Sequence, residues 1–322
     1  MPIRIAIVGP GALGCLFASL LFPKRQGAKD SLWLVDHNQE RATLLAAQGI
    51  LYETDKGQER YPISISSDPQ AIGPMDMVLF CVKSQDLDGC LQSCLPLLSP
   101  QTLVVFLQNG ISHLDIQKRM NLLTAPAFAS SSEGATLLGP GHVLHAGRGI
   151  THLGFLQKPA DRHQQQLAEL ARILQEAGLD VALSQDIRTQ LWAKLFINTG
   201  INPLTALYNR SNGQLLTSCA ARSRLKNIVH EAETVARACG ITISVDPLQA
   251  TLAVCKSTAR NISSMLQDRR HKRPTEIAAI NGAIVREGKR LGIATPFNEE
   301  VVQQIRNMEE KYNQDTTRTE EI

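Results

Sequence analysis

The sequence has little charge of either sign, which limits the partners it can bind. Only 20% of its 322 residues are charged, and the net charge is +3 at pH 7. Nucleic-acid-binding domains carry a dense footprint of lysine and arginine, which this balance does not provide. We therefore expect no nucleic-acid partner, although a local basic patch would still suit a small anionic molecule.

Long hydrophobic runs are also missing. No apolar stretch of the sequence approaches the roughly 18 residues that a membrane span requires. The N-terminal residues Arg4–Gly9 are typical of a strand and lack the basic region and apolar stretch of a signal peptide. We expect no membrane partner, and a cytoplasmic location follows as the default.

The cysteines follow no metal-binding pattern. There are seven, at positions 15, 81, 90, 94, 219, 239 and 255. Cys90 and Cys94 are four residues apart, but no second pair completes a zinc tetrad. The odd count and irregular spacing favour scattered buried thiols in a reducing compartment, so we predict no metal site.

The first half of the chain alternates between strand-like and helix-like segments, with no internal repeat. Apolar runs predict strands at Ile3–Val8, Leu32–Val35, Met77–Val82 and Leu103–Leu107, and helical spacing predicts helices at Leu13–Leu21 and Glu40–Gln48. Continuous apolar strands of this kind indicate a parallel sheet covered on both faces. The glycine-rich and β-branched segment Gly134–Gly154 predicts antiparallel strands that extend this sheet.

After about residue 160 the pattern becomes helical. A helix is predicted at Arg162–Ala177, a short strand at Leu179–Leu183, and helices from Asp186 to Glu310 with breaks at Asn202–Pro203, Asn212–Gly213, Asp246–Pro247 and Arg273–Pro274. We predict an α/β chain with a Rossmann-type sheet domain over residues 1–184 and an all-helical domain over residues 185–313. The polar tail, residues 314–322, is predicted to be disordered.

A glycine-rich loop follows the first predicted strand. Gly9-Pro10-Gly11-Ala12-Leu13-Gly14 fits the pattern G-x-G-x-x-G and opens an apolar helix. The first glycine permits a tight turn, the second lets the backbone approach a pyrophosphate, and the third lets the helix pack on the strand. In this strand–turn–helix context we predict a dinucleotide site that includes Ala12 and Leu13, and not merely a structural turn.

Three more loop residues are candidates for ligand contact. Asp36 ends the second predicted strand, where an acidic residue usually accepts hydrogen bonds from ribose hydroxyls and disfavours a 2′-phosphate, which argues for NADH. Arg41 would instead suit a 2′-phosphate, or it is a solvated helix residue. Lys83 and Asn109 follow later strands, where ligands bind in open α/β sheets, but as isolated loop residues either would also be unremarkable.

Four polar residues recur every four positions on one predicted helix: Gln190, Lys194, Asn198 and Asn202. Spacing alone is typical of a solvent face. However, the stripe holds no glutamate, and asparagine is a poor helix former, so a buried hydrogen-bonding wall is the alternative. A lysine on such a wall would be partly desolvated, which lowers its pKa and suits it to protonate a ketone oxygen during reduction.

The last candidate segment is a basic run that is followed by one acidic residue, Glu276. Arg269–Arg273 is typical of a solvated loop, and it would also attract an acidic substrate. Thr275 after Pro274 predicts the start of a helix with Glu276 in its first turn, where the simplest role is an interaction with the helix dipole.

Several stretches together resemble the ketopantoate reductase (2-dehydropantoate 2-reductase) family, over Ile3 to about Asn298. Beyond the glycine loop they are His145–Gly154, Leu191–Leu195 with Asn198, Ile201–Ala206, Asn261–Asp268, and Thr275–Ile277 with Ile280–Gly282. The resemblance implies a Rossmann-type domain, an all-helical C-terminal domain and a substrate site in the cleft between them. It also implies reduction of 2-dehydropantoate to (R)-pantoate with NADPH, on the route to pantothenate and coenzyme A.

The resemblance assigns roles to individual residues. It makes Lys194 the proton donor and Glu276 the active-site glutamate, matches Asn109, Asn198, Asn202 and Ser264 to substrate- and nicotinamide-contacting positions, and matches Lys83 to a lysine near cofactor and substrate. Many family members carry an arginine where this chain has Asp36. NADP(H) is therefore the family expectation, and NAD(H) is the alternative.

Two other functions stay open at this point. One is a reductase of the same fold that acts on another small 2-oxo acid. The other is a non-catalytic dinucleotide-binding sensor, which predicts the loss of Lys194 or Glu276, although both are present. By analogy with helical second domains of this broader class, a homodimer is an alternative to a monomer.

Overall fold

The computed structural model describes residues 3–24, 31–122 and 124–320. The chain divides into two compact units. The first, here called the sheet unit, comprises Met1–Gln108 and His113–Gln190, and the second, the helical unit, comprises Asn109–Ser112 and Leu191–Ile322. Each unit has its own hydrophobic core among the described residues.

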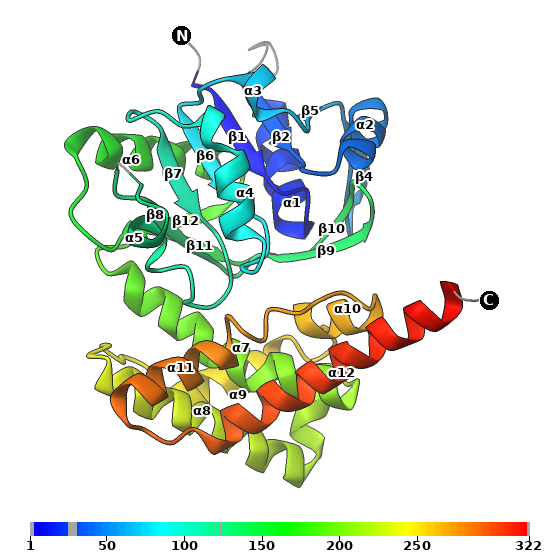
Figure 1. The fold of residues 1–322 in the computed structure, drawn as a ribbon, viewed down its shortest axis with the longest axis vertical. Coiled ribbons are helices and arrows are strands. Elements are labelled where there is room, and N and C mark those ends of the chain that lie inside the picture. The colour runs from blue at the N-terminus through cyan, green and yellow to red at the C-terminus, as the bar shows by residue number, and fades with distance from the viewer. Residues whose placement is uncertain (1–2, 25–30, 123, 321–322) are drawn as a thin grey trace. The chain divides into compact units, whose positions relative to one another are not determined.

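The sheet unit is built on an eight-stranded sheet (Figure 1). In spatial order its strands are β5 (Ser64–Ser66), β2 (Leu32–Val35), β1 (Ile5–Val8), β6 (Met77–Phe80), β7 (Leu103–Phe106), β8 (Ala127–Ser131), β11 (Ile150–Phe155) and β12 (Asp180–Leu183). The six strands from β5 to β8 are parallel, and β11 is antiparallel to β8. The parallel part has the 3-2-1-4-5-6 order of dinucleotide-binding folds, which confirms the predicted fold class.

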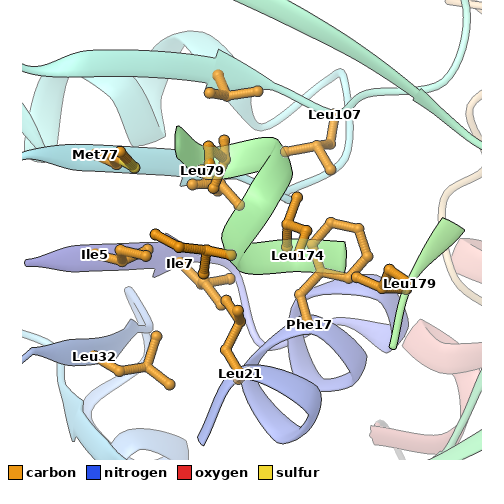
Figure 2. Packing of buried hydrophobic residues seen from close by; sticks show 14 of the residues in the cluster. Ile5, Ile7, Phe17, Leu21, Leu32, Met77, Leu79, Leu107, Leu174 and Leu179 are labelled. Carbon is orange, nitrogen blue, oxygen red and sulfur yellow. The ribbon is translucent and has the colours of Figure 1, made fainter. Parts of the chain in front are cut away.

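Helices cover the central strands. The helices of this unit are α1 (Ala12–Leu21), α2 (Gln39–Gln48), α3 (Pro69–Ile72), α4 (Leu87–Ser93), α5 (Ile116–Arg119) and α6 (Asp161–Glu176), with 3-10 turns at Phe22–Lys24 and Leu95–Leu97. Figure 2 shows Ile7 of β1, Phe17 of α1 and Leu174 of α6 in one cluster of buried side chains. Strands β1, β6 and β7 are buried at every residue, as their continuous apolar sequences predict.

A second, four-stranded sheet packs against α1. Its order is β4 (Gly57–Tyr61), β3 (Ile50–Thr54), β10 (His142–Gly147) and β9 (Gly134–Gly139). The prediction that Gly134–Gly154 extends the main sheet is correct for β11 and wrong for β9 and β10. The reason is that β10 pairs in parallel with β3, a strand that the sequence did not predict.

The helical unit contains only helices, turns and loops among its described residues, as predicted. It holds α7 (Ile187–Tyr208) from Leu191 onward, a 3-10 turn at Gly213–Thr217, α8 (Cys219–Ala238), α9 (Pro247–Ser257), α10 (Ser264–Arg270), α11 (Asn281–Leu291) and α12 (Pro296–Glu320). The predicted breaks at Asn212–Gly213, Asp246–Pro247 and Arg273–Pro274 all fall between helices.

Other helix boundaries differ from the prediction. Helix α7 continues through Pro203, where the sequence predicts a break. Residues 276–280 form a bend and turn, so α11 begins at Asn281 and not at Thr275. Helix α12 runs to Glu320, across residues 314–320 of the tail that was predicted to be disordered, while residues 321 and 322 lie outside the described residues.

Candidate active site

Two glycines hold the loop between β1 and α1 in a tight conformation. Gly9 has a φ of +101°, and a Cβ there would lie 2.7 Å from Cγ1 of Val82. A Cβ on Gly14 would lie 2.0 Å from the carbonyl oxygen of Gly9. Neither position can accept a side chain without a shift of the backbone, because the turn and the helix–strand contact are both close.

Gly11 is open where the other two are crowded. It is the N-cap of α1, and a Cβ built on it would have no heavy atom within 4 Å. Ala12 and Leu13 begin α1, so their backbone N–H groups have no acceptor within the helix, and the first turn carries no acidic residue. An uncovered glycine at a positive helix end fits the pyrophosphate of a dinucleotide.

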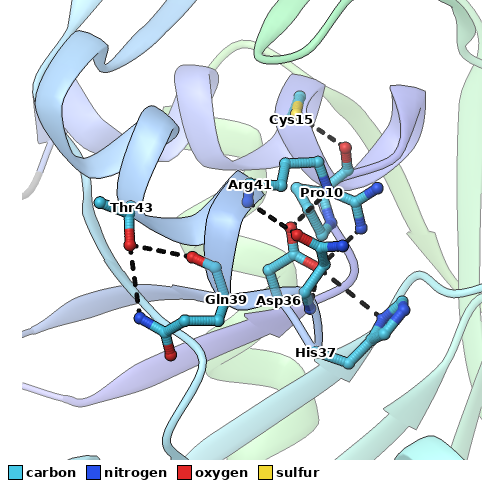
Figure 3. Close-up of polar contacts among 8 residues, drawn as sticks. Pro10, Cys15, Asp36, His37, Gln39, Arg41 and Thr43 are labelled. Atoms are coloured by element: carbon cyan, nitrogen blue, oxygen red, sulfur yellow. Dashed lines mark hydrogen bonds and ion pairs between the residues drawn. The ribbon is translucent and has the colours of Figure 1, made fainter.

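Asp36 and Arg41 form a closed ion pair after β2 (Figure 3). The Asp36 side chain is 0% exposed. Its two carboxylate oxygens accept hydrogen bonds from Nε and Nη2 of Arg41 at 2.5 and 2.7 Å, and the backbone N–H of Asn38 donates to Oδ1 at 3.0 Å. Arg41 is therefore not a freely solvated helix residue, and its charge is already matched.

Lys83 lies in the turn that follows β6 and is half-buried. The residue that shapes this edge of the sheet is Gln108, to which the sequence assigned no role. Gln108 follows β7, and its buried Nε2 donates to the carbonyl oxygens of Phe80 at 2.9 Å and Val82 at 3.1 Å. It ties the loop that carries Lys83 to the neighbouring strand. The only signal in the sequence is a glutamine directly after the predicted strand Leu103–Leu107, where a buried amide would need hydrogen-bond partners.

The polar stripe of α7 lies in a partly buried position. Gln190, Lys194 and Asn198 are half-buried and Asn202 is buried. The neighbouring apolar side chains of α7 belong to the core, with the rings of Trp192 and Phe196 6.0 Å apart. Burial of this kind favours the hydrogen-bonding wall over the solvent face.

Lys194 has the electrostatics of a proton donor. Burial lowers the pKa of its ammonium group from 10.5 to about 8, although the negative charge of Glu276 acts in the opposite direction. At neutral pH such a lysine is still mostly protonated. It nevertheless releases its proton more readily than an exposed lysine does.

Glu276 is held from a distant part of the chain. Nδ2 of Asn109 donates to Oε2 of Glu276 at 2.8 Å. Gly110, which follows Asn109 in the chain, has a φ of +80°, and a Cβ on it would lie 2.0 Å from the carbonyl oxygen of Ala279. The simpler alternative for Glu276, an interaction with the N-terminus of a helix, does not hold, because α11 begins only at Asn281.

Ser264 is the exposed first residue of α10. The preceding Ser263 caps the helix, since its Oγ accepts a hydrogen bond from the backbone N–H of Leu266 at 3.1 Å. The same Oγ lies 2.6 Å from Oγ1 of Thr205, which also donates to the carbonyl oxygen of Asn202 at 2.9 Å. Thr205 and Ser263 therefore connect the turn of Asn202 to Ser264, a link that the sequence did not predict.

The basic run after α10 is partly structural. Nη1 of Arg269 donates to the carbonyl oxygens of Ala206 and Leu207, the latter at 3.2 Å. These carbonyls lie in the last turn of α7, where no backbone N–H of the helix donates to them. Arg269 thus caps the C-terminus of α7. From the sequence, the basic run was expected to be a solvated loop or to attract an acidic substrate.

The predicted site residues fall into two groups. The glycine loop, Asp36 and Lys83 follow β1, β2 and β6, so they lie at the carboxyl edge of the parallel sheet, where open α/β sheets bind ligands. The helical unit holds the other group, which consists of Asn109, Lys194, Asn198, Asn202, Ser264 and Glu276. Within this group, Asn109 donates a hydrogen bond to Glu276.

No metal centre is found in the part of the chain that the structure describes, where no three histidine, cysteine or acidic side chains gather around a common point. The cysteines are free thiols, of which Cys15, Cys94 and Cys255 are buried and Cys219 is exposed. A separate finding is that none of the described helices combines the length and the apolar character of a membrane span.

Two family models match nearly the whole chain. Residues 5–158 match the family described as "Ketopantoate reductase PanE/ApbA", and residues 186–309 match "Ketopantoate reductase PanE/ApbA C terminal". The chain is also 31% identical over 312 residues to the 2-dehydropantoate 2-reductase of Vibrio cholerae serotype O1, an alignment that covers 96% of this chain and 99% of that protein.

Solved structures agree with this assignment. The PanE/ApbA family ketopantoate reductase of Ralstonia eutropha JMP134 superposes with a TM-score of 0.86 at 33% identity, covering 97% of this chain and all of the other. D-mandelate dehydrogenase in a ternary structure with NADH and anilino(oxo)acetate gives a TM-score of 0.87 at 26% identity, again over 97% of this chain and 100% of that one. The chain therefore belongs to the ketopantoate reductase family, and it is an NAD(P)H-dependent oxidoreductase.

Proposed function

We propose that this enzyme reduces 2-dehydropantoate to (R)-pantoate, on the route to pantothenate and coenzyme A, and that it prefers NADH to NADPH. The observation that carries the proposal is the Lys194 ammonium, whose pKa is lowered to about 8 by burial while Glu276 partly compensates. The names of the relatives, 2-dehydropantoate 2-reductase, support the choice of substrate.

The side chains of the helical unit supply the proton chemistry. A dinucleotide held at the glycine loop would provide the hydride for the ketone carbon. Lys194 donates a proton to the ketone oxygen as negative charge builds on it. Glu276 keeps Lys194 protonated at neutral pH by opposing the effect of burial, and the hydrogen bond from Asn109 fixes the orientation of the Glu276 carboxylate.

The remaining polar residues suit a small, polar 2-oxo acid. Lys194, Asn198 and Asn202 lie four residues apart on α7, so their side chains repeat about every 6 Å along the helix axis. Such a row offers a cation and two amides on one face of the helix. The amides of Asn198 and Asn202 and the hydroxyl of Ser264 both donate and accept hydrogen bonds, as a carboxylate and a hydroxyl on the substrate require.

The preference for NADH rests on the Asp36–Arg41 pair. Arg41 neutralises Asp36, so the pair has no net positive charge with which to attract a 2′-phosphate. That phosphate carries a charge of about −1.5 to −2 at pH 7. A 2′-phosphate would also have to approach a buried carboxylate. The similar D-mandelate dehydrogenase, whose structure was solved with NADH, supports the same choice.

The test is oxidation of NADH and of NADPH, followed at the nicotinamide absorbance band with 2-dehydropantoate as substrate. We expect turnover that depends on 2-dehydropantoate, with the larger kcat/KM for NADH. Efficient turnover with NADPH alone would contradict the cofactor preference and leave the substrate in place. No turnover with either dinucleotide would contradict the substrate.

A second candidate substrate is an aryl 2-oxo acid, the type of compound that gives mandelate on reduction. It is favoured by the likeness to D-mandelate dehydrogenase over 97% of this chain. The two candidates are separated by the ratio of kcat/KM for 2-dehydropantoate and phenylglyoxylate under the same conditions. We expect 2-dehydropantoate to be the better substrate, and the reverse order would assign the enzyme to the second class.

A further inference from the structure

Helix α7 contains a proline between two candidate substrate-binding turns. Pro203 lies inside the helix and has no backbone N–H. In a regular helix the N–H of residue 203 would donate to the carbonyl oxygen of Thr199, four positions earlier. Thr199 is 0% exposed, so its carbonyl oxygen has no access to bulk water as a substitute. A buried carbonyl without a donor is costly, and it would lie directly after Asn198.

The side chain of Asn281 supplies the missing hydrogen bond. Its Nδ2 donates to the carbonyl oxygen of Thr199 at 3.1 Å, from the first residue of α11. A backbone carbonyl can only accept, so the group that faces it must be the NH₂ of the amide. Asn281 is itself 0% exposed. The amide thus replaces, from 82 residues along the chain, the bond that Pro203 removes.

A second buried asparagine fixes the orientation of this amide. The other N–H of Asn281 donates to Oδ1 of Asn298 at 3.0 Å. Nδ2 of Asn298 in turn donates to the carbonyl oxygen of Ile228 at 3.1 Å and to the carboxylate of Glu231 at 2.7 Å. The network joins α7, α11, α12 and α8, and its buried amides have little freedom to rearrange.

We infer that Asn281 is a positioning residue for substrate binding, which acts through the backbone of α7 on Asn198 and Asn202. The inference rests on the proposed function. Asn281 bonds to Thr199, which lies between the two asparagines in the sequence. Lys194 precedes Thr199 by more than one turn, so its proton chemistry depends less on this bond. The loss of Asn281 therefore affects substrate affinity more than the proton transfer.

The test is a double-mutant cycle with Asn281→Ala and Pro203→Ala. Asn281→Ala leaves the Thr199 carbonyl unpaired, and we expect a rise of about tenfold in KM for 2-dehydropantoate and a Tm lower by roughly 2–8 °C. The pH dependence of kcat stays unchanged. Pro203→Ala alone stays close to the wild-type enzyme. In the double variant the N–H of Ala at position 203 bonds Thr199 again, so KM recovers most of the loss, whereas Tm recovers in part because Oδ1 of Asn298 still lacks the donor that Asn281 supplied.

Asn212→Ala is the matched control, since Asn212 is also a buried asparagine of the helical unit and its Nδ2 donates to Thr258 at 2.9 Å. It should lower Tm without raising KM. If Asn281→Ala behaves like this control, or if Pro203→Ala gives no rescue, the positioning role is wrong. A wild-type enzyme inactive on every 2-oxo acid would overturn the proposed function and this role together. Rescue of Tm alone would then establish only the replaced hydrogen bond.

Discussion

At the scale of single residues, Lys194 is the group on which the proposed chemistry depends most directly. We expect Lys194→Ala to lower kcat by about 10²–10⁴-fold, the usual contribution of a positioned proton donor. Lys194→Arg keeps the positive charge but cannot release a proton near neutral pH, so it should be nearly as slow. Binding of NADH, measured by quenching of protein fluorescence, should survive both changes. Near-normal turnover of the alanine variant would remove Lys194 from the mechanism.

The pH dependence of the two directions follows from the same residue. Because the pKa of Lys194 is lowered to about 8, reduction should slow as the pH rises through that value, and oxidation of pantoate should speed up over the same range. Glu276→Gln removes the negative charge that raises this pKa, so the midpoint should move to lower pH. Rates over a pH series, with both substrates saturating, give the two midpoints. An unchanged midpoint in the Glu276 variant would contradict the coupling.

The proposed preference for NADH depends on Asp36. Asp36→Asn keeps the shape of the side chain but removes the charge that neutralises Arg41. The freed guanidinium can then meet a 2′-phosphate with a charge-assisted hydrogen bond, so the ratio of kcat/KM for NADPH over NADH should rise by about 10–100-fold. Adding Arg41→Met to this variant should abolish the gain. If the gain persists without Arg41, another residue holds the phosphate.

The Asp36–Arg41 pair also shows which properties of a single residue can be predicted from the sequence. The position of Asp36 at the end of a strand predicts contact with the ribose, because that position is set by the strand itself. The role of Arg41 stayed open, since the pairing depends on how the turn after β2 brings α2 over the carboxylate. Gln108 was missed for the same reason, because its partners are backbone carbonyls on another strand.

At the scale of elements, local pattern succeeds where one element determines its own structure. Apolar strands and the periodic helix α6 are predicted correctly, because burial on a defined face fixes their period. Pro203 and Thr275 show the limit. The break at Pro203 is bridged by Asn281, and the bend at Glu276 is held by Asn109, each from a distant part of the chain. Hydrogen bonds of this kind cannot be predicted from the local sequence of either segment.

The segment 109–112 is an element whose shape is set by one glycine. Gly110→Ala would place a Cβ 2.0 Å from the carbonyl oxygen of Ala279 at a φ of +80°, so the backbone must shift. The shift should break the bond from Asn109 to Glu276, lowering kcat/KM by at least about tenfold and Tm by several degrees. Gly240→Ala is a suitable control, since it has a φ of +73° but no heavy atom near its Cβ. Its Tm should fall without a change in kcat/KM.

At the scale of the whole molecule, the two units divide the proposed tasks. The residues suited to a dinucleotide, namely the glycine loop and Asp36, lie in the sheet unit, and those suited to proton transfer lie in the helical unit. The sequence indicates this division, because the glycine loop and the stripe of α7 occur in segments with different periodicity. Substitutions in one group should therefore leave the task of the other intact.

Gly11 offers the sharpest test of this division. NADH at 100 times its Kd should stabilise the wild-type enzyme by about 2.7 kcal/mol, seen as a rise of several degrees in Tm. Gly11→Asp adds a favourable N-cap to α1 in space that no atom occupies, so the Tm without ligand should stay equal or rise slightly. The new carboxylate would nevertheless repel the pyrophosphate, and the rise with NADH should disappear. Lys194→Ala should keep the full rise. An intact NADH response in Gly11→Asp would mean that the dinucleotide does not bind at the N-terminus of α1.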